Sequence, residues 1–461
     1  MLRNELADSG QSARNPYNER NVGTYFVQNF GCRATQADGA ALETLLAAKG
    51  LEAAGERSAA DLVVLNTCTV TSSADDDVRQ TIRRVHRENP AAQILVTGCY
   101  AQRAPEELAC MPGVEWVIGN SHKTQIADLV TTETRRNPLH IIGSAGTPYH
   151  GNIHVGDIFA QHDFLSAPVE DAAGDRTRPN LKIQDGCNNR CSFCIIPFVR
   201  GRSRSAPVEQ VVDQVRGLAG RYREIVLSGI NLGRWGREPG SHMRLADLIR
   251  LLLAETGVER LRLSSVEPMD FSDDLLGLMA ASPRIAKHVH APLQSGSDRT
   301  LRRMHRKYRP RHYADRVLKA RELMPDAAIG ADVMVGFPGE TDANFEESRR
   351  FIESLPFTYL HVFTYSERPG TPAAGYPGAV PMPERKRRNH VLRELAEAKN
   401  REFRQRMVGR TLSAVTLHET RTALTGNYLK VQLTTPREPN SIVDVRIGSL
   451  TSNGVSEIDP Q

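Results

Sequence analysis

The chain has 461 residues, enough for about three domains of roughly 150 residues each, and its seven cysteines are too few, and odd in number, for a disulfide-stabilised secreted protein. It shows no signal peptide and no apolar segment long enough to cross a bilayer, so we expect a cytoplasmic protein that does not contact a membrane. The net charge of +5 is mildly basic, which is compatible with a polyanionic partner without identifying one.

Residues 1–21 are polar and without periodicity, and we predict that they are disordered. From 22 to 135, short apolar segments alternate with amphipathic ones, which is the rhythm of an open parallel α/β sheet. The predicted strands are Thr24–Asn29, Asp61–Asn66, Gln93–Thr97 and Val114–Ile118, and the helical segments between them include Gln36–Lys49 and Val78–Glu88. The sequence therefore predicts an N-terminal α/β domain over residues 22–135.

Three cysteines of this region each follow the end of a predicted strand: Cys32, Cys68 and Cys99. Because the carboxyl ends of parallel strands meet at one edge of a sheet, we expect the three thiols to share a crevice as metal ligands. Gly31 and Gly98 let the backbone approach closely there. The alternative is three ordinary buried cysteines, and their repeated position at strand ends counts against it.

A predicted linker over residues 136–178 separates this domain from a second alternating region at 179–405. The predicted strands of that region are Leu181–Gln184, Glu224–Ser228, Arg260–Ser264, His288–Ala291, Ala328–Val335 and Tyr359–Thr364. The predicted helices include Val208–Leu218, Leu245–Leu253, Arg309–Leu323 and Asp342–Ser354. Six such β/α units predict an open, partial (β/α)6 barrel with its chemistry at the carboxyl ends of the strands.

The loop after the first of these strands carries Cys187, Cys191 and Cys194, separated by three and then two residues. A cubic iron–sulfur cluster needs four ligands, but the loop offers three and no cysteine follows in the chain. One iron would stay open to a small molecule, so the cluster could act on a substrate as well as carry electrons. Structural zinc is the main alternative, but a closed zinc site needs four ligands and this loop has no histidine.

Other strand ends of the predicted barrel hold polar residues and glycines, namely Ser228, Gly229, Asn231, Glu267 and Gln294. Together, beside an open cluster, they would form a pocket for a nucleoside-like cofactor. Glu267 and Gln294 are suited to hydrogen-bonding its ribose or its amino acid end. For any single residue, an ordinary role in forming the loop explains the position equally well.

The rest of the chain suggests contact with nucleic acid. Arg200, Arg202 and Arg204 follow the cysteine loop directly, and we expect them to meet a phosphate near the chemistry, although arginine runs are often only solvated helix faces.

A long charged helix is predicted from Pro383 to Met407. Residues 406–461 then form the predicted strands Thr411–Leu417, Tyr428–Leu433 and Ile442–Ile447. These predict a small antiparallel, OB-like barrel that binds RNA or serves as a structural cap.

With these residues assembled, the chain from about 22 to 450 resembles the radical S-adenosylmethionine (SAM) methylthiotransferases. The triplet Cys187, Cys191 and Cys194 matches the radical SAM signature, and the N-terminal set matches three cysteines that hold an auxiliary cluster in that family. The C-terminal segment is similar to the TRAM domain, an RNA-binding barrel. The segments at 96–102, 181–187, 226–233 and 263–268 resemble the members that act on threonylcarbamoyladenosine in tRNA. The chain departs from the family pattern at Thr35, Ala37 and Ala291.

The resemblance implies two [4Fe–4S] clusters and SAM as cofactors. SAM would chelate the open iron and be cleaved to a 5′-deoxyadenosyl radical, which abstracts hydrogen from C2 of an adenine, and the second cluster would supply methylated sulfur. The implied partners are the tRNA anticodon stem-loop and an external low-potential electron donor. We expect the protein to be a monomer. Three alternatives remain: the same reaction on isopentenyladenosine, a ribosomal protein substrate, and a non-catalytic iron–sulfur redox sensor that binds RNA.

Overall fold

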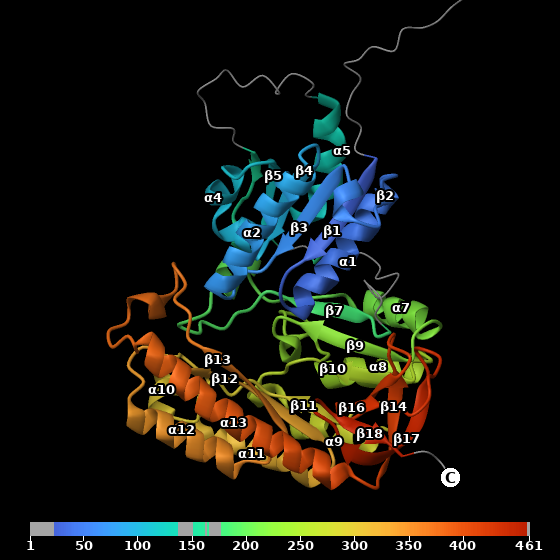
Figure 1. Ribbon diagram of the computed structural model, residues 1–461, viewed down its shortest axis with the longest axis vertical. Helices are drawn as coiled ribbons and strands as arrows, with labels where there is room; N and C mark the ends of the chain where they lie inside the picture. Colours follow the sequence, from blue (N-terminus) through green and yellow to red (C-terminus); the bar gives the residue numbers. More distant parts are fainter. Residues whose placement is uncertain (1–22, 137–150, 162–163, 166–176, 459–461) are drawn as a thin grey trace, which may run out of the picture.

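The computed structural model describes residues 23–136, 151–161, 164–165 and 177–458, which form an N-terminal sheet, a central two-sheet region and a small C-terminal barrel (Figure 1). The segment predicted to be disordered, 1–21, and most of the predicted linker lie outside the described residues. No helix in the described part of the chain is long and apolar enough to cross a membrane.

The N-terminal sheet has six parallel strands in the order β2-β1-β3-β4-β5-β6. Its strands are β1 (Thr24–Asn29), β2 (Glu52–Ala53), β3 (Leu62–Thr67), β4 (Gln93–Gly98), β5 (Val114–Gly119) and β6 (Asn152–His154). Its helices are α1 (Arg33–Ala48), α2 (Ser72–Glu88), α3 (Cys99–Arg103), α4 (Pro105–Ala109) and α5 (Ile126–Arg136). Strand β6 belongs to this sheet although it lies within the range predicted to be a linker.

Both faces of this sheet are covered, which explains the continuous apolar run of β3. Val63 and Leu65 pack with Val78 and Ile82 of α2 on one face. Leu62 and its alternate neighbours pack on the other face against α1 and α5. Burial on two sides is the usual state of an all-parallel sheet, and it leaves the carboxyl edge of the strands as the place for polar and ligating residues.

The central region holds six parallel strands in two sheets, β10-β9-β7-β8 and β11-β12-β13, with β8 added antiparallel to β7. The strands are β7 (Asn180–Asp185), β8 (Arg204–Ser205), β9 (Glu224–Gly229), β10 (Arg260–Leu263), β11 (His288–His290), β12 (Ala328–Val335) and β13 (Tyr359–Thr364). The helices are α6 (Ile196–Arg200), α7 (Val208–Ala219), α8 (Leu245–Glu255), α9 (Asp273–Ala281), α10 (Asp298–Arg303), α11 (Pro310–Leu323), α12 (Asp342–Ser354) and α13 (Met382–Met407). The amide of Val266 donates to the carbonyl of His290 across the gap between the sheets, at 3.0 Å, so the six strands form the predicted partial barrel.

Strand alternation gives this barrel an apolar outside and a polar inside. Residues such as Leu181, Leu227 and Val333 point outward and join the large core formed with the helices. Their neighbours point into the lumen and include Lys182, Gln184, Ser228, Arg262, His290 and Asp332. Polar groups therefore line the inside of the barrel, next to the cysteine loop.

The C-terminal barrel is closed in the order β14-β15-β16-β18-β17 and covers the amino ends of the central strands (Figure 1). Its strands are β14 (Thr411–Thr416), β15 (Thr422–Thr425), β16 (Lys430–Gln432), β17 (Ile442–Leu450) and β18 (Val455–Glu457). The barrel was expected to be antiparallel, but β16 and β18 pair in parallel. Arg262 of β10 donates to the carbonyl of Thr425 at 3.0 Å, and Tyr428 stacks on His288 with ring centroids 4.4 Å apart. These contacts cover the lumen at the amino ends of the central strands.

Candidate active site

The cysteine loop leaves the carboxyl end of β7 through Gly186, which has a φ of +70°. The amide of Cys187 donates to the carbonyl of Gly201 at 3.0 Å, and the amide of Cys194 donates to that of Cys191 at 3.1 Å. Ser192 ties the loop to the barrel through its amide, which donates to the carbonyl of Met304 at 3.1 Å. The three thiols are thus held in one fixed turn at the top of the lumen.

Gly186 is a point where this loop can be tested. A Cβ added there would lie 1.9 Å from the carbonyl oxygen of Arg202, and the positive φ would be strained for any side chain. We expect Gly186→Ala to displace the loop and to lower the iron content of the purified protein. Gly217→Ala, exposed in the last turn of α7 with no atom near the new Cβ, is the matched control and should retain full iron content. Equal iron in both variants would contradict this account.

The three thiols of the loop interact electrostatically and have one arginine partner. Burial, together with the neighbouring thiols, raises the pKa of Cys194 to about 12, so this thiol needs a nearby cation to ionise. Arg306 donates from Nη1 to Sγ of Cys191 at 3.2 Å and from Nη2 to the carboxylate of Glu267. It lies 115 residues from Cys191 in the chain, and no sequence pattern marks it.

The N-terminal cysteines come together at the carboxyl edge of β1, β3 and β4, as predicted from their strand-end positions. Cys32 caps α1, Cys68 follows β3, and Cys99 begins α3 after Gly98. A Cβ on Gly31 would lie 2.9 Å from Sγ of Cys68, so only glycine lets the first loop approach the second so closely. Burial and the charges of Cys99 and Cys32 raise the pKa of Cys68 to about 12.

The two cysteine sets face each other across the boundary between the first two domains. Cys99 packs directly with Ile195 and Val199, which follow Cys194 in the chain. Asn120 of the N-terminal domain donates to the carbonyl of Val199 at 2.7 Å. Cys99 therefore lies against the segment that directly follows the cysteine loop.

A buried network of charges centred on Arg200 holds this arrangement. Arg200 is only 2% exposed and donates to Asp38 of α1 and to Asp185 of β7, each at 2.9 Å, and to Sγ of Cys99 at 3.3 Å. Asp38 also pairs with Lys182 and Lys123. Burial alone would raise the pKa of Asp38, but these cations hold it well below its ordinary value. One guanidinium thus joins both domains to an N-terminal cysteine.

The structure corrects the expectation for the arginines after the cysteine loop. Arg200 is buried and paired with carboxylates, so it does not meet a phosphate. Arg204 is partly buried, with Nη2 3.7 Å from Asp185, and Arg202 alone is exposed. The structure therefore assigns Arg200 to the domain boundary and leaves only Arg202 free for RNA.

The predicted SAM-contacting residues divide into two groups. Asn231 donates from Nδ2 to Sγ of Cys187 at 3.7 Å, and Glu267 reaches the loop through Arg306, so both lie beside the cysteines. Ser228 is buried and donates to the carbonyl of Leu181 at 3.4 Å. Gly229 approaches Gln184, where a Cβ would lie 2.9 Å from its side chain. Gln294, at a φ of +66°, contacts β12 instead, where its amide donates to the carbonyl of Asp332 at 2.8 Å.

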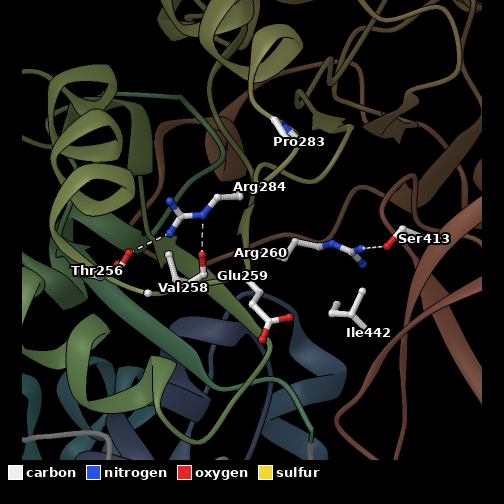
Figure 2. Close-up of a pocket in the computed structure, with 9 residues that line it drawn as sticks. Thr256, Val258, Glu259, Arg260, Pro283, Arg284, Ser413 and Ile442 are labelled. Atoms are coloured by element: carbon white, nitrogen blue, oxygen red, sulfur yellow. Dashed lines mark hydrogen bonds between the residues drawn. The ribbon is translucent and has the colours of Figure 1, made fainter.

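A cavity of about 440 Å³ lies away from this chemistry (Figure 2). It opens at the amino ends of β10 and β11, between the central region and the C-terminal barrel, and Arg260 bridges it to Ser413 at 2.6 Å. Arg284 fixes its wall by donating to the carbonyls of Val258 and Thr256. Its position at the opposite ends of the strands from the cysteine loop excludes it as the active site.

Both cysteine sets suit iron–sulfur clusters. The six thiols form no disulfide in the described chain, where all six lie. Each set is sulfur-only, and in each a buried arginine donates a hydrogen bond to one Sγ, the kind of outer contact that positions a metal-ligating thiol. Thr35 adds a hydroxyl 3.5 Å from Sγ of Cys32, so this departure from the family pattern contacts a thiol without replacing it.

Comparison with known proteins agrees with this geometry. One matching family model is described as the radical SAM superfamily and covers residues 181–352, and another, the uncharacterized protein family UPF0004, covers 24–119. The solved structure of the radical SAM methyltransferase TsrM from Kitasatospora setae has a TM-score of 0.56 at 15% identity over 77% of both chains, which shows a shared fold.

Curated relatives match nearly end to end. Threonylcarbamoyladenosine tRNA methylthiotransferase MtaB from Aquifex aeolicus is 36% identical over 91% of this chain and 99% of its own length. MtaB from Bacillus subtilis is also 36% identical, over 89% and 90%. The tRNA-2-methylthio-N(6)-dimethylallyladenosine synthase from Thermobifida fusca is 34% identical over 85% and 77%. The chain therefore belongs to the radical SAM methylthiotransferase family.

Proposed function

We propose that the protein is a tRNA methylthiotransferase that adds a methylthio group to C2 of N6-threonylcarbamoyladenosine at position 37, next to the anticodon. The observation that carries the proposal is the packing of Cys99 against Ile195 and Val199, because it sets a second sulfur-rich centre beside the radical SAM loop. The identity to the MtaB enzymes supports the choice of the threonylcarbamoyl substrate.

The residues of this chain have distinct roles in that reaction. Two [4Fe–4S] clusters and SAM, when bound, supply hydrogen abstraction from carbon and a transferable sulfur. Cys187, Cys191 and Cys194 would hold one cluster, and the N-terminal cysteines the other. Asn231 and Glu267 would orient SAM at the open iron, with Arg306 fixing Glu267. Arg200 would hold the two cysteine sets in a fixed relative position, because it contacts both Cys99 and Asp185.

The remaining parts of the proposal concern the partners. A target base in the single-stranded anticodon loop can be turned into the lumen at low energetic cost. The closed C-terminal barrel is suited to gripping the anticodon stem-loop as a TRAM-like domain. We also propose that the protein works as a cytoplasmic monomer with an external low-potential electron donor.

A mass-spectrometric nucleoside profile tests this function. In cells that lack the chain, we expect the methylthio group to be missing from threonylcarbamoyladenosine alone, and to return on complementation. Loss from isopentenyladenosine instead would reassign the substrate to the dimethylallyl relatives. An unchanged profile would refute both tRNA assignments and direct the search to ribosomal proteins and then to a redox sensor.

A further inference from the structure

A second polar cluster, outside the cysteine sites, lies on the lumen face of β11, β12 and β13. The two imidazoles and the carboxylate of His290, Asp332 and His361 have ligand atoms within 4.8 Å of one another. Asp332 Oδ1 lies 3.1 Å from Nδ1 of His361 and 3.3 Å from Nε2 of His290. The backbone carbonyl of Asp332 accepts from the amide of Gln294, so the cluster lies directly below that turn.

The cluster is well placed to accept hydrogen bonds from a ligand. Burial would raise the pKa of Asp332, but hydrogen bonds from the two histidines hold it well below its ordinary value. The carboxylate is therefore ionised, and only one of its oxygens faces both imidazoles. His290 is only 6% exposed, and its ring is held on both sides, by the hydroxyl of Ser265 2.6 Å from Nδ1 and by Asp332 beside Nε2.

The residues around this cluster are suited to a base with a charged substituent. On the same face of β13, Phe363 is 49% exposed and its ring lies 6.4 Å from that of His361. An exposed aromatic ring here is suited to stacking on an extruded base. Arg33, next to Cys32, is close enough for its charge to act on His288 and Tyr359. The ring of Tyr359 lies 5.8 Å from that of His290, so this positive charge is one residue removed from the cluster and favours an anionic group beside it.

We propose that His290, Asp332 and His361 form the subsite that recognises the polar arm on N6 of the target adenine. This inference rests on the proposed function. The ureido N–H and the hydroxyl of a threonylcarbamoyl arm are donors, and they would donate to the Asp332 carboxylate. The carboxylate of the arm would lie toward Arg33, which adjoins Cys32 in the chain.

The same groups exclude an apolar arm. A dimethylallyl arm has no donor or acceptor, so its burial would remove water from the ionised Asp332 carboxylate without replacing the lost hydrogen bonds. Sites built to hydrogen-bond a substrate reject analogues without the matching group far more strongly than apolar pockets reject a larger or smaller one. The cluster therefore also determines specificity between the two kinds of modified adenosine.

Binding of two anticodon stem-loop RNAs tests the subsite, one with threonylcarbamoyladenosine at position 37 and one with unmodified adenosine. The full chain with reconstituted clusters should prefer the modified RNA. We expect Asp332→Asn and His361→Phe to lower this preference by about tenfold or more, because each removes a hydrogen bond to a charged group. Asp274→Asn, at an exposed ion pair with Arg250, is the matched control and should keep the wild-type preference.

Two results would overturn the inference. One is a preference for the modified RNA that is the same in the wild type and in both lumen variants. The other is one equivalent of zinc in the purified protein that disappears in His361→Phe, which would assign the cluster to a metal. If the wild-type protein forms no methylthiolated threonylcarbamoyladenosine, the proposed function itself fails, and product analysis of the wild type separates that failure from the others.

Discussion

Cys194→Ala is expected to abolish cleavage of SAM, whereas Cys68→Ala is expected to retain cleavage and to lose transfer of sulfur. The reason is that the two thiols belong to different sets, one at the top of the barrel and one at the edge of the N-terminal sheet. With the two sets as the proposed ligands of two clusters, removing one of three thiols would open the coordination of only the cluster concerned. Each variant should therefore keep about half of the iron of the wild type, since the other cluster still forms.

The measurement is a paired assay of 5′-deoxyadenosine and methylthiolated nucleoside after reduction of the reconstituted protein. Cys110→Ala is the control because Cys110 follows α4, away from both sets, and should leave both products unchanged. The loss of either product should exceed about a thousandfold, as expected when a group essential to the chemistry is removed. Full methylthiolation by Cys68→Ala would rule out a two-cluster mechanism.

The periodicity of the sequence was enough to predict the scaffold. The strands β1, β12 and β13 have the predicted bounds, because an apolar stretch between turn residues defines where a strand of a parallel sheet begins and ends. The strands that were missed are short: β2, β8, β15 and β18 have two to four residues, too few to show a period. Strand β6 was missed for the same reason, in a stretch rich in glycine and histidine.

The cysteines were predictable and their partners were not. Cys32, Cys68 and Cys99 follow strand ends, so topology alone brings them together. Arg200 contacts Cys99 across 101 residues, and Arg306 contacts Cys191 across 115. In the sequence these arginines look like any other basic run, and only tertiary packing shows that they are buried.

The lumen cluster was missed for a related reason. His290 and His361 come from strands that are far apart in the chain, and Asp332 lies within an apolar strand, where a single acid is weak evidence by itself. The signal that was available is the strand period, because these three residues alternate with the residues of their strands that join the large core. Polar residues on the inner face of a barrel strand therefore merit attention even without a motif.

Arg200→Met is expected to be strongly destabilising. It would leave Asp38 and Asp185 buried without the guanidinium that lies between them, and would remove a donor from Cys99. Removing one partner from a buried ion pair typically lowers the free energy of unfolding by about 3–5 kcal/mol. The shift in the denaturation midpoint measures the effect, with Arg202→Met, an exposed arginine two residues away, as the control.

Arg200→Lys distinguishes an effect on stability from an effect on the alignment of the two cysteine sets. A lysine keeps the positive charge, but its single ammonium cannot contact two carboxylates and a sulfur in the planar geometry of a guanidinium. We expect this variant to recover much of the stability, to cleave SAM, and to transfer less sulfur per SAM cleaved, because Cys99 is no longer tied to the end of β7. If Arg200→Lys couples cleavage to transfer as the wild type does, the guanidinium supports the fold alone and not the alignment of the two cysteine sets.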